Sequence, residues 1–169
     1  MDDRMLAILK ERARRYSIKI ESAASSVSSL GTFVGYRSGD LIFGIPSQIV
    51  HEFATLQNWT PFSGRRFLVG LTHLRGDVMS LVDVSEAVTG KPATNNSWML
   101  VMQGKGGRVA APATEIIGIR NVEMSELLAP EQSPVESPLL MATTVDLWFL
   151  LDEQKLNSVF EGLSVFSDK

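Results

Sequence analysis

The stretch Phe67–Val84, FLVGLTHLRGDVMSLVDV, joins two apolar runs through one polar tip. The tip is HLRGD at residues 73–77, and the second run ends on a single carboxylate, Asp83. Apolar runs that meet at a glycine-containing turn are typical of a β-hairpin. The stretch therefore predicts a strand, a tight turn and a second strand, with Gly76 supplying a positive φ at the turn.

The residues before this hairpin also have the composition of strands. Strands are expected at Thr32–Arg37 and Leu41–Ile45, joined by a turn at residues 38–40, and again at Gln48–Thr55. Pro46 interrupts the ladder because it has no N–H to donate. Residues 57–66 are predicted as a loop, and a short helix at residues 85–88 is expected to follow the hairpin.

The second half of the chain repeats the pattern of the first. When residues 33–53 are laid over residues 99–119 without a gap, Pro46 falls on Pro112, an offset of 66 residues (112 − 46). Each half ends with an apolar strand, an aspartate and a helix, with Asp83 and Asp152 as the aspartates. Both aspartates are expected to cap the helix that follows. The repeat predicts a mostly β fold of two antiparallel barrels in tandem.

The expected domain organisation follows from this repeat. The first barrel is placed at about residues 31–92 and the second at about 93–152, with a closing helix at 153–163. Each barrel alone would be marginally stable, so the two are expected to share an interface. Residues 1–30 are expected to lie outside the barrels as an N-terminal helix and a Ser/Ala linker. That helix is predicted to pack on its own domain, on a partner or on a second copy.

Composition excludes several classes of protein. The net charge of −3 does not suggest a nucleic-acid partner, and no apolar run is long enough to insert in a membrane. There are no cysteines, and the only histidines, His51 and His73, lack metal-ligand spacing. No G-x-S-x-G motif occurs, and the Gly-rich run at residues 104–107 leads into a strand pattern rather than a helix. We therefore expect a cytoplasmic interaction protein that is not an enzyme and has neither metal nor cofactor.

Residues 44–84 contain three motifs: VHEF, VGLTHLRG and MSLVDV. Through these motifs the chain resembles the CheW family of chemotaxis coupling proteins. VHEF at 50–53 is similar to the family's Val-x-Glu-Ile, and VGLTHLRG at 69–76 to its Gly-Val-x-Asn-Leu-Arg-Gly. MSLVDV at 79–84 is similar to the family's Pro-Ile-Val-Asp-Leu. The resemblance covers about residues 31–163 and is carried by pattern alone in the second half.

The resemblance implies two pseudo-symmetric five-stranded SH3-like barrels and a non-catalytic adaptor in a chemosensory array. Such an adaptor bridges a methyl-accepting chemoreceptor and a CheA-type histidine kinase. The regulatory domain of the kinase is implied to pair barrel to barrel, and the receptor's helical tip to enter a groove between the barrels.

The resemblance also implies which residues bind these partners. Val50 and Glu52 match family positions near the receptor groove, and Arg75 matches the hairpin arginine implicated in coupling. The apolar neighbours that are candidates for the groove are Ile49, Phe53, Leu71 and Leu74. For the apolar candidates, ordinary core packing is the alternative interpretation.

Three residues depart from the family pattern: His73 replaces an asparagine, Asp77 an apolar residue and Pro46 a strand residue. These departures leave open which receptor is bound, and whether the system controls motility, pili or gene expression. A stand-alone barrel that senses a small molecule remains the alternative function.

Overall fold

The computed structural model describes residues 7–8, 28–62 and 64–163. The N-terminal helix predicted over residues 1–24 lies outside these residues except at residues 7–8. Most of the predicted linker lies outside them too, and Ser29 already belongs to the first strand. No helix among the described residues is long and apolar enough to cross a membrane.

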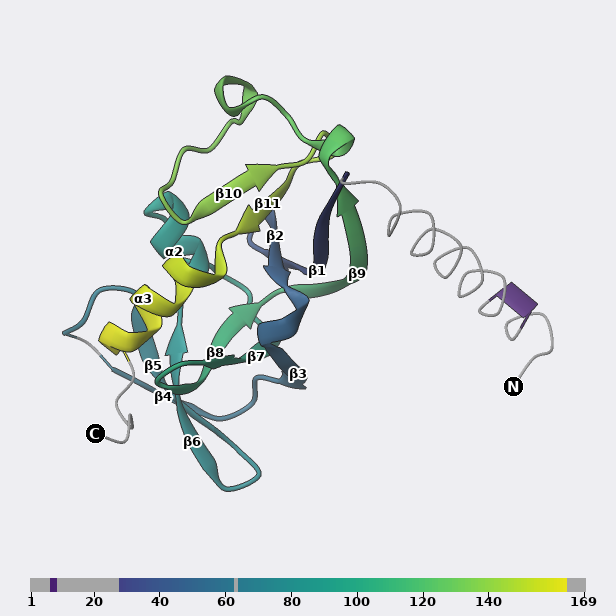
Figure 1. Ribbon diagram of the computed structural model, residues 1–169. Coiled ribbons are helices and arrows are strands. Elements are labelled where there is room, and N and C mark those ends of the chain that lie inside the picture. The colour runs from purple at the N-terminus through teal and green to yellow at the C-terminus, as the bar shows by residue number, and fades with distance from the viewer. Residues whose placement is uncertain (1–6, 9–27, 63, 164–169) are drawn as a thin grey trace.

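Two sheets form the body of the protein (Figure 1). The five-stranded sheet has the order β10-β11-β2-β1-β9, and the six-stranded sheet has the order β3-β7-β8-β6-β5-β4. The strands of the first sheet are β1 (Ser29–Ser38), β2 (Leu41–Pro46), β9 (Glu115–Glu123), β10 (Leu140–Thr143) and β11 (Trp148–Leu151). Those of the second are β3 (Val50–Thr55), β4 (Trp59–Pro61), β5 (Leu68–Leu74), β6 (Asp77–Val82), β7 (Trp98–Gly104) and β8 (Gly107–Ala113). The predicted mostly β class is confirmed.

The sequence repeat is present in the strand register. Phe33 faces Pro46 across β1 and β2, and Met99 faces Pro112 across β7 and β8. The second pairing is the first moved by the same 66 residues (99 − 33 and 112 − 46). The two hairpins therefore have equivalent pairing.

The sheets do not divide the chain at residue 92, because each combines strands from both halves. β6 of the first half runs parallel to β8 of the second, and β11 of the second runs parallel to β2 of the first. Across these pairs Ser80 faces Val109, and Phe149 faces Phe43. Parallel pairing requires a long connection, and between β6 and β8 this connection contains α2 and β7. The predicted boundary near residue 92 therefore does not separate one sheet from the other. Each sheet needs strands from both halves of the chain.

Two predicted elements differ in the structure. The strand predicted at Gln48–Thr55 begins only at Val50, because Ser47–Ile49 forms the 3₁₀ turn η1 after Pro46. The loop predicted at residues 57–66 contains β4, in which Trp59 faces Thr72 of β5. β4 is the sixth strand of the second sheet.

The largest apolar core is built from both sheets and closed by helix α3 (Glu153–Leu163). Tyr36, Phe43 and Phe149 pack ring against ring within it. From α3, Leu156 and Phe160 enter the same core. The closing helix is thus confirmed at its predicted bounds.

Both predicted helix caps are confirmed. One carboxylate oxygen of Asp83 accepts from the Glu86 N–H at 3.1 Å and caps α2 (Val84–Thr89). The other accepts from the Ala93 N–H at 2.8 Å, which ties down the chain that leads to the second half. Asp152 accepts from the Lys155 N–H at 3.1 Å. Asp83 is therefore a structural carboxylate.

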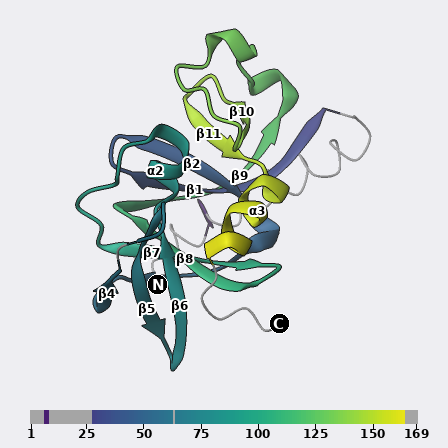
Figure 2. The same cartoon turned by 90° about the vertical axis from the view of Figure 1, so that its left-hand side faces the viewer.

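At one end of the molecule, β10, β11 and the connection from β9 form a lobe (Figure 2). This connection contains the short 3₁₀ turns η2 (Met124–Glu126) and η3 (Pro130–Gln132). The hairpin β5–β6 projects at the opposite end (Figure 1).

Candidate functional site

The tip of the β5–β6 hairpin is a two-residue turn. Leu74 faces Asp77, and the two residues between them, Arg75 and Gly76, have φ values of 51° and 86°. Positive φ at both positions is the geometry of a type I′ turn, whose twist matches that of the flanking strands. The positive φ of Gly76 was predicted from the sequence, whereas that of Arg75 was not. A two-residue X-Gly loop between strands was the signal for it.

Glu52 on β3 fixes the side chain of Arg75. The Arg75 Nη1 donates to both carboxylate oxygens of Glu52, each at 2.8 Å. Glu52 is largely buried, with 19% of its side chain exposed, whereas 73% of the Arg75 side chain is exposed. Among the described residues Arg75 has no other ion pair or hydrogen bond. The structure thus brings two predicted site residues together and leaves most of the guanidinium open to a partner.

The apolar candidates occupy less accessible positions. Ile49 belongs to the main core with only 5% of its surface exposed, so it does not line an open groove. Val50 and Phe53 are half-buried against that core, and Leu74 is half-buried against the smaller cluster around Met79. Core packing therefore accounts for most of the burial of these four residues.

Leu71 lines a shallow cavity beside the hairpin. The cavity has a volume of about 380 Å³ and is also lined by Trp59 and His73. Leu71 and His73 come from β5, and Trp59 from the edge strand β4. Leu71 therefore shares one surface with His73, the residue that replaces the family asparagine.

His51 lies near the same carboxylate. Its Nε2 is 3.7 Å from Glu52. No group of three or more potential metal ligands occurs within residues 7–8, 28–62 and 64–163.

Comparison with known proteins identifies the family. The family model for the CheW-like domain matches residues 32–160. The chain belongs to the CheW-like family. A search of curated proteins found no significant match.

Solved structures support the fold of this CheW-like chain. The scaffolding protein TtCheW from Thermoanaerobacter tengcongensis is similar, with a TM-score of 0.60 and 14% sequence identity. The similarity covers 72% of this chain and 84% of TtCheW. At this identity the similarity supports the fold alone. Members of the CheW-like family serve as non-catalytic scaffolds in chemotaxis.

Asp77, which differs from the family pattern, forms an ion pair that was not predicted from the sequence. Arg108 on β8 donates to Asp77 at 3.2 Å, and both side chains are exposed. This ion pair joins the β5–β6 tip to the β7–β8 hairpin. The β5–β6 tip is therefore held on both sides, by Glu52 through Arg75 and by Arg108 through Asp77. We call these four residues the hairpin face. An acidic residue in the turn and a basic residue in the next hairpin were the only sequence signals for the second pair.

Proposed function

We propose that this chain is a cytoplasmic, non-catalytic adaptor that couples a methyl-accepting chemoreceptor to a CheA-type histidine kinase. Membership of the CheW-like family supports the role of a scaffold. The observation that carries the finer proposal is the Glu52–Arg75 pair, because it presents a fixed, mostly exposed guanidinium at the end of a projecting hairpin. Arginine is well suited to this role, since it is often a dominant residue in protein interfaces.

The proposed mechanism requires no chemical step. The receptor's helical tip binds by burying a few apolar side chains, as in helix-in-groove recognition, with Arg75 at the border of the contact. The kinase's regulatory domain pairs with a barrel end elsewhere on the adaptor. When both partners are held by one chain, the effective concentration of each near the other rises, and this produces the coupling.

Size-exclusion chromatography with a CheA-type regulatory domain tests the kinase half of the proposal. Mixing at tens of micromolar is expected to give co-elution for the wild-type chain. Separate elution of the two proteins would count against the adaptor function.

A small-molecule sensor is the second candidate, and one cavity favours it. The cavity has a volume of about 560 Å³ between the β1–β2 turn, α2 and residues 134–136. Ser38 lines it, and the buried Oγ of Ser38 has no hydrogen-bond partner among the described residues. A ligand-dependent rise in melting temperature, without binding to the kinase domain, would favour the sensor.

A further inference from the structure

We propose that the N-terminal segment of this chain, residues 1–27, docks on the lobe formed by residues 121–151 of the same molecule. We call residues 121–151 the acidic lobe. The proposal goes beyond the adaptor function and does not depend on it. It rests on the charge of the lobe, its exposed apolar side chains and the point at which the N-terminal segment joins the body.

The acidic lobe carries negative charge without any basic residue. Residues 121–151 contain no lysine, arginine or histidine. Their acidic residues are Glu123, Glu126, Glu131, Glu136 and Asp146. A surface region with one sign of charge attracts a segment of the opposite sign.

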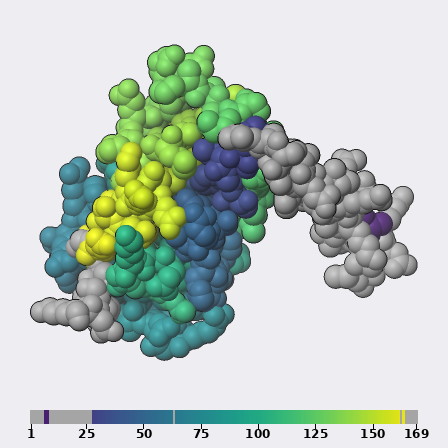
Figure 3. Space-filling view, in the orientation of Figure 1, coloured from purple at the N-terminus to yellow at the C-terminus, as the bar shows by residue number. Residues whose placement is uncertain are grey.

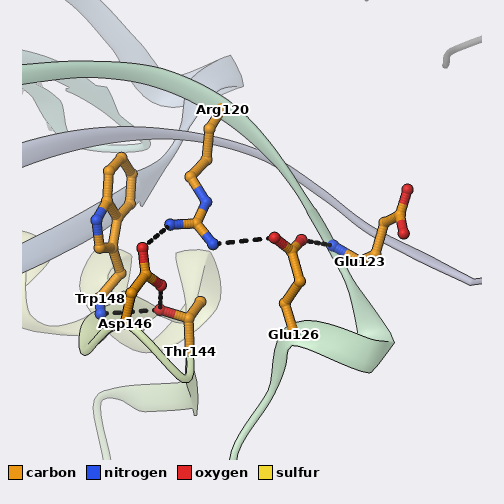
Figure 4. A network of polar contacts seen from close by, with 6 residues as sticks. All are labelled: Arg120, Glu123, Glu126, Thr144, Asp146 and Trp148. Atoms are coloured by element: carbon orange, nitrogen blue, oxygen red, sulfur yellow. Dashed lines mark hydrogen bonds and ion pairs between the residues drawn. The ribbon is translucent and has the colours of Figure 1, made fainter.

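Two of these carboxylates are neutralised from outside the lobe (Figure 4). Arg120 donates to Asp146 at 2.6 Å and to Glu126 at 3.2 Å. Its guanidinium also lies over the Trp148 ring, 4.7 Å from the ring centroid. This network ties the lobe to β9 through Arg120.

Two of the three remaining carboxylates are available to a ligand. Glu131 and Glu136 are exposed, and neither has an ion pair or hydrogen bond through its carboxylate among the described residues. Both belong to the connection between β9 and β10 that borders a cavity of about 580 Å³. Glu136 itself lines that cavity, mainly among apolar residues such as Leu128 and Met141.

The lobe also exposes large apolar side chains. The exposed ones in the lobe are Met124, Met141, Val145 and Leu147, and Val145 has 61% of its surface exposed. Met124 and Val145 lie on neighbouring segments, since the Val145 N–H donates to the carbonyl of Glu126 at 2.8 Å. Exposed apolar groups rimmed by charge are typical of a surface that binds a partner. Figure 3 shows the lobe, in green, forming one end of the molecule.

The sequence of the N-terminal segment complements this surface. Its basic residues are Arg4, Lys10, Arg12, Arg14, Arg15 and Lys19, against the acidic Asp2, Asp3, Glu11 and Glu21. Five of its apolar residues recur at helical spacing on one side of the predicted helix: Met5, Leu6, Leu9, Ala13 and Tyr16. A basic amphipathic segment suits an acidic surface that also exposes methionine, valine and leucine.

The segment joins the body at the acidic lobe. The Met124 N–H donates to the carbonyl of Ser28 at 2.7 Å, so the chain leaves β1 beside an exposed residue of the lobe. A short tether raises the effective concentration of the segment at the lobe. This is why we assign the segment of the same molecule as the occupant, rather than that of a second copy.

Methionine-methyl NMR on the full chain tests the proposal. The chain has no cysteine, so Ala7→Cys gives a unique site for a nitroxide label on the polar side of the predicted helix. We expect the label to cause a strong loss of signal for the lobe methionines Met124 and Met141. The buried methionines Met79, Met99 and Met102 are internal references and are expected to lose less.

A mixing experiment identifies the occupant. Isotope-enriched protein without the label is mixed with labelled protein that is not enriched. Docking within one molecule predicts two results. The lobe signals are undisturbed in this mixture, and they are lost when the enriched protein itself carries the nitroxide label. Signal loss in the mixture would assign the lobe to a second copy and overturn the proposal. Undisturbed lobe signals in both samples would also overturn it, since the segment then docks elsewhere or not at all.

Charge reversal tests the electrostatic basis. Glu131→Lys and Glu136→Lys are each expected to restore part of the lost signal, whereas Glu161→Lys on α3 serves as the control and is expected to restore none. Raising the salt concentration to about 1 M, where the Debye length is about 3 Å, is expected to weaken docking as well. Signal loss that is insensitive to both treatments would contradict charge-driven docking.

Discussion

Arg75 donates from one guanidinium nitrogen to both carboxylate oxygens of Glu52, each at 2.8 Å, and so links the tip of β5–β6 to β3. Because Glu52 is mostly buried and Arg75 mostly exposed, the carboxylate acts as the fixed member of the pair. We therefore propose that the guanidinium binds a partner and that Glu52 orients it.

Glu52→Gln is expected to weaken receptor binding while leaving the fold intact. Because most of the Arg75 side chain is exposed, solvent screens this ion pair, so the free energy of unfolding should fall by no more than about 1 kcal/mol. Receptor affinity should fall severalfold, because the unanchored arginine loses its orientation before binding. Urea denaturation and a binding titration measure the two effects. A large loss of stability with unchanged affinity would show that Glu52 serves the fold alone.

The Asp77–Arg108 pair is expected to position the hairpin tip. Either charge reversal, Asp77→Arg or Arg108→Asp, should lower receptor affinity severalfold by placing like charges together, and the double exchange should recover much of it. Reversal of Arg37 and Glu115, a pair of similar exposure and equal 3.2 Å distance between β1 and β9, is the matched control and should leave affinity unchanged. If the double exchange binds no better than either single variant, the pair does not position the tip.

Asp83→Ala is expected to be more damaging than Asp152→Ala. Asp83 is buried and accepts two backbone hydrogen bonds, so its loss removes a cap and leaves the Ala93 N–H without its partner. The expected cost is about 1–3 kcal/mol, against about 1 kcal/mol for the more exposed cap Asp152. Thermal or urea denaturation measures both. Equal costs would contradict the role given to the Ala93 contact.

Gly35→Ala is expected to destabilise the five-stranded sheet, because a Cβ on Gly35 would overlap the ring of Trp148. Overpacking of this kind costs about 1–3 kcal/mol. In a Trp148→Leu background the same change should cost less, since the ring is gone, and the difference between the two costs is the coupling energy. Equal costs in both backgrounds would show that the ring is not the obstacle.

Acid is expected to weaken the attachment of the acidic lobe through Asp146. Partial burial alone would raise the pKa of Asp146, but hydrogen bonds from Arg120 and Thr144, with the positive charge of Arg120, hold that pKa below its usual range. A lowered pKa gives a stabilising contribution that is present above the unfolded-state pKa of about 3.9 and lost as the pH falls through the folded-state value. The difference in melting temperature between wild type and Asp146→Asn should therefore shrink below about pH 4.

Asp40→Asn is the control for this pH series. The Asp40 side chain is exposed and has no ion pair or hydrogen bond among the described residues, so this substitution removes an aspartate without breaking a pairing. An Asp146→Asn difference that stays constant down to pH 2 would contradict the pairing with Arg120.

The sequence predicted local structure well and the strand exchange poorly. The repeat, both caps and the closing helix followed from turn chemistry and apolar spacing, which act over a few residues. The exchange of β6 and β11 between halves depends on pairings such as Phe149 with Phe43, which lie far apart in the chain. The sequence of one strand does not identify a pairing partner that is far away in the chain. Two separate barrels in tandem were therefore the simplest prediction.

The polar candidates were chosen by resemblance to the family, and the apolar ones because they neighbour them in the sequence. Glu52 and Arg75 were both selected from the sequence, and the structure brings them into contact. Ile49 was selected as a neighbour of these positions, but it follows Pro46 in a 3₁₀ turn that directs it into the core. Arg108 was missed because its contact with Asp77 joins two hairpins through side chains alone.

Co-sedimentation of three components tests the central claim most directly. Vesicles that carry a methyl-accepting receptor are mixed with a CheA-type regulatory domain, with or without this chain. The account predicts that the kinase domain pellets with the vesicles only when the chain is present, that Arg75→Ala reduces the pelleted kinase domain about tenfold or more, as for an interface hot spot, and that Arg37→Ala has no effect. Pelleting that is independent of the chain, or that is unchanged by Arg75→Ala, would contradict the account.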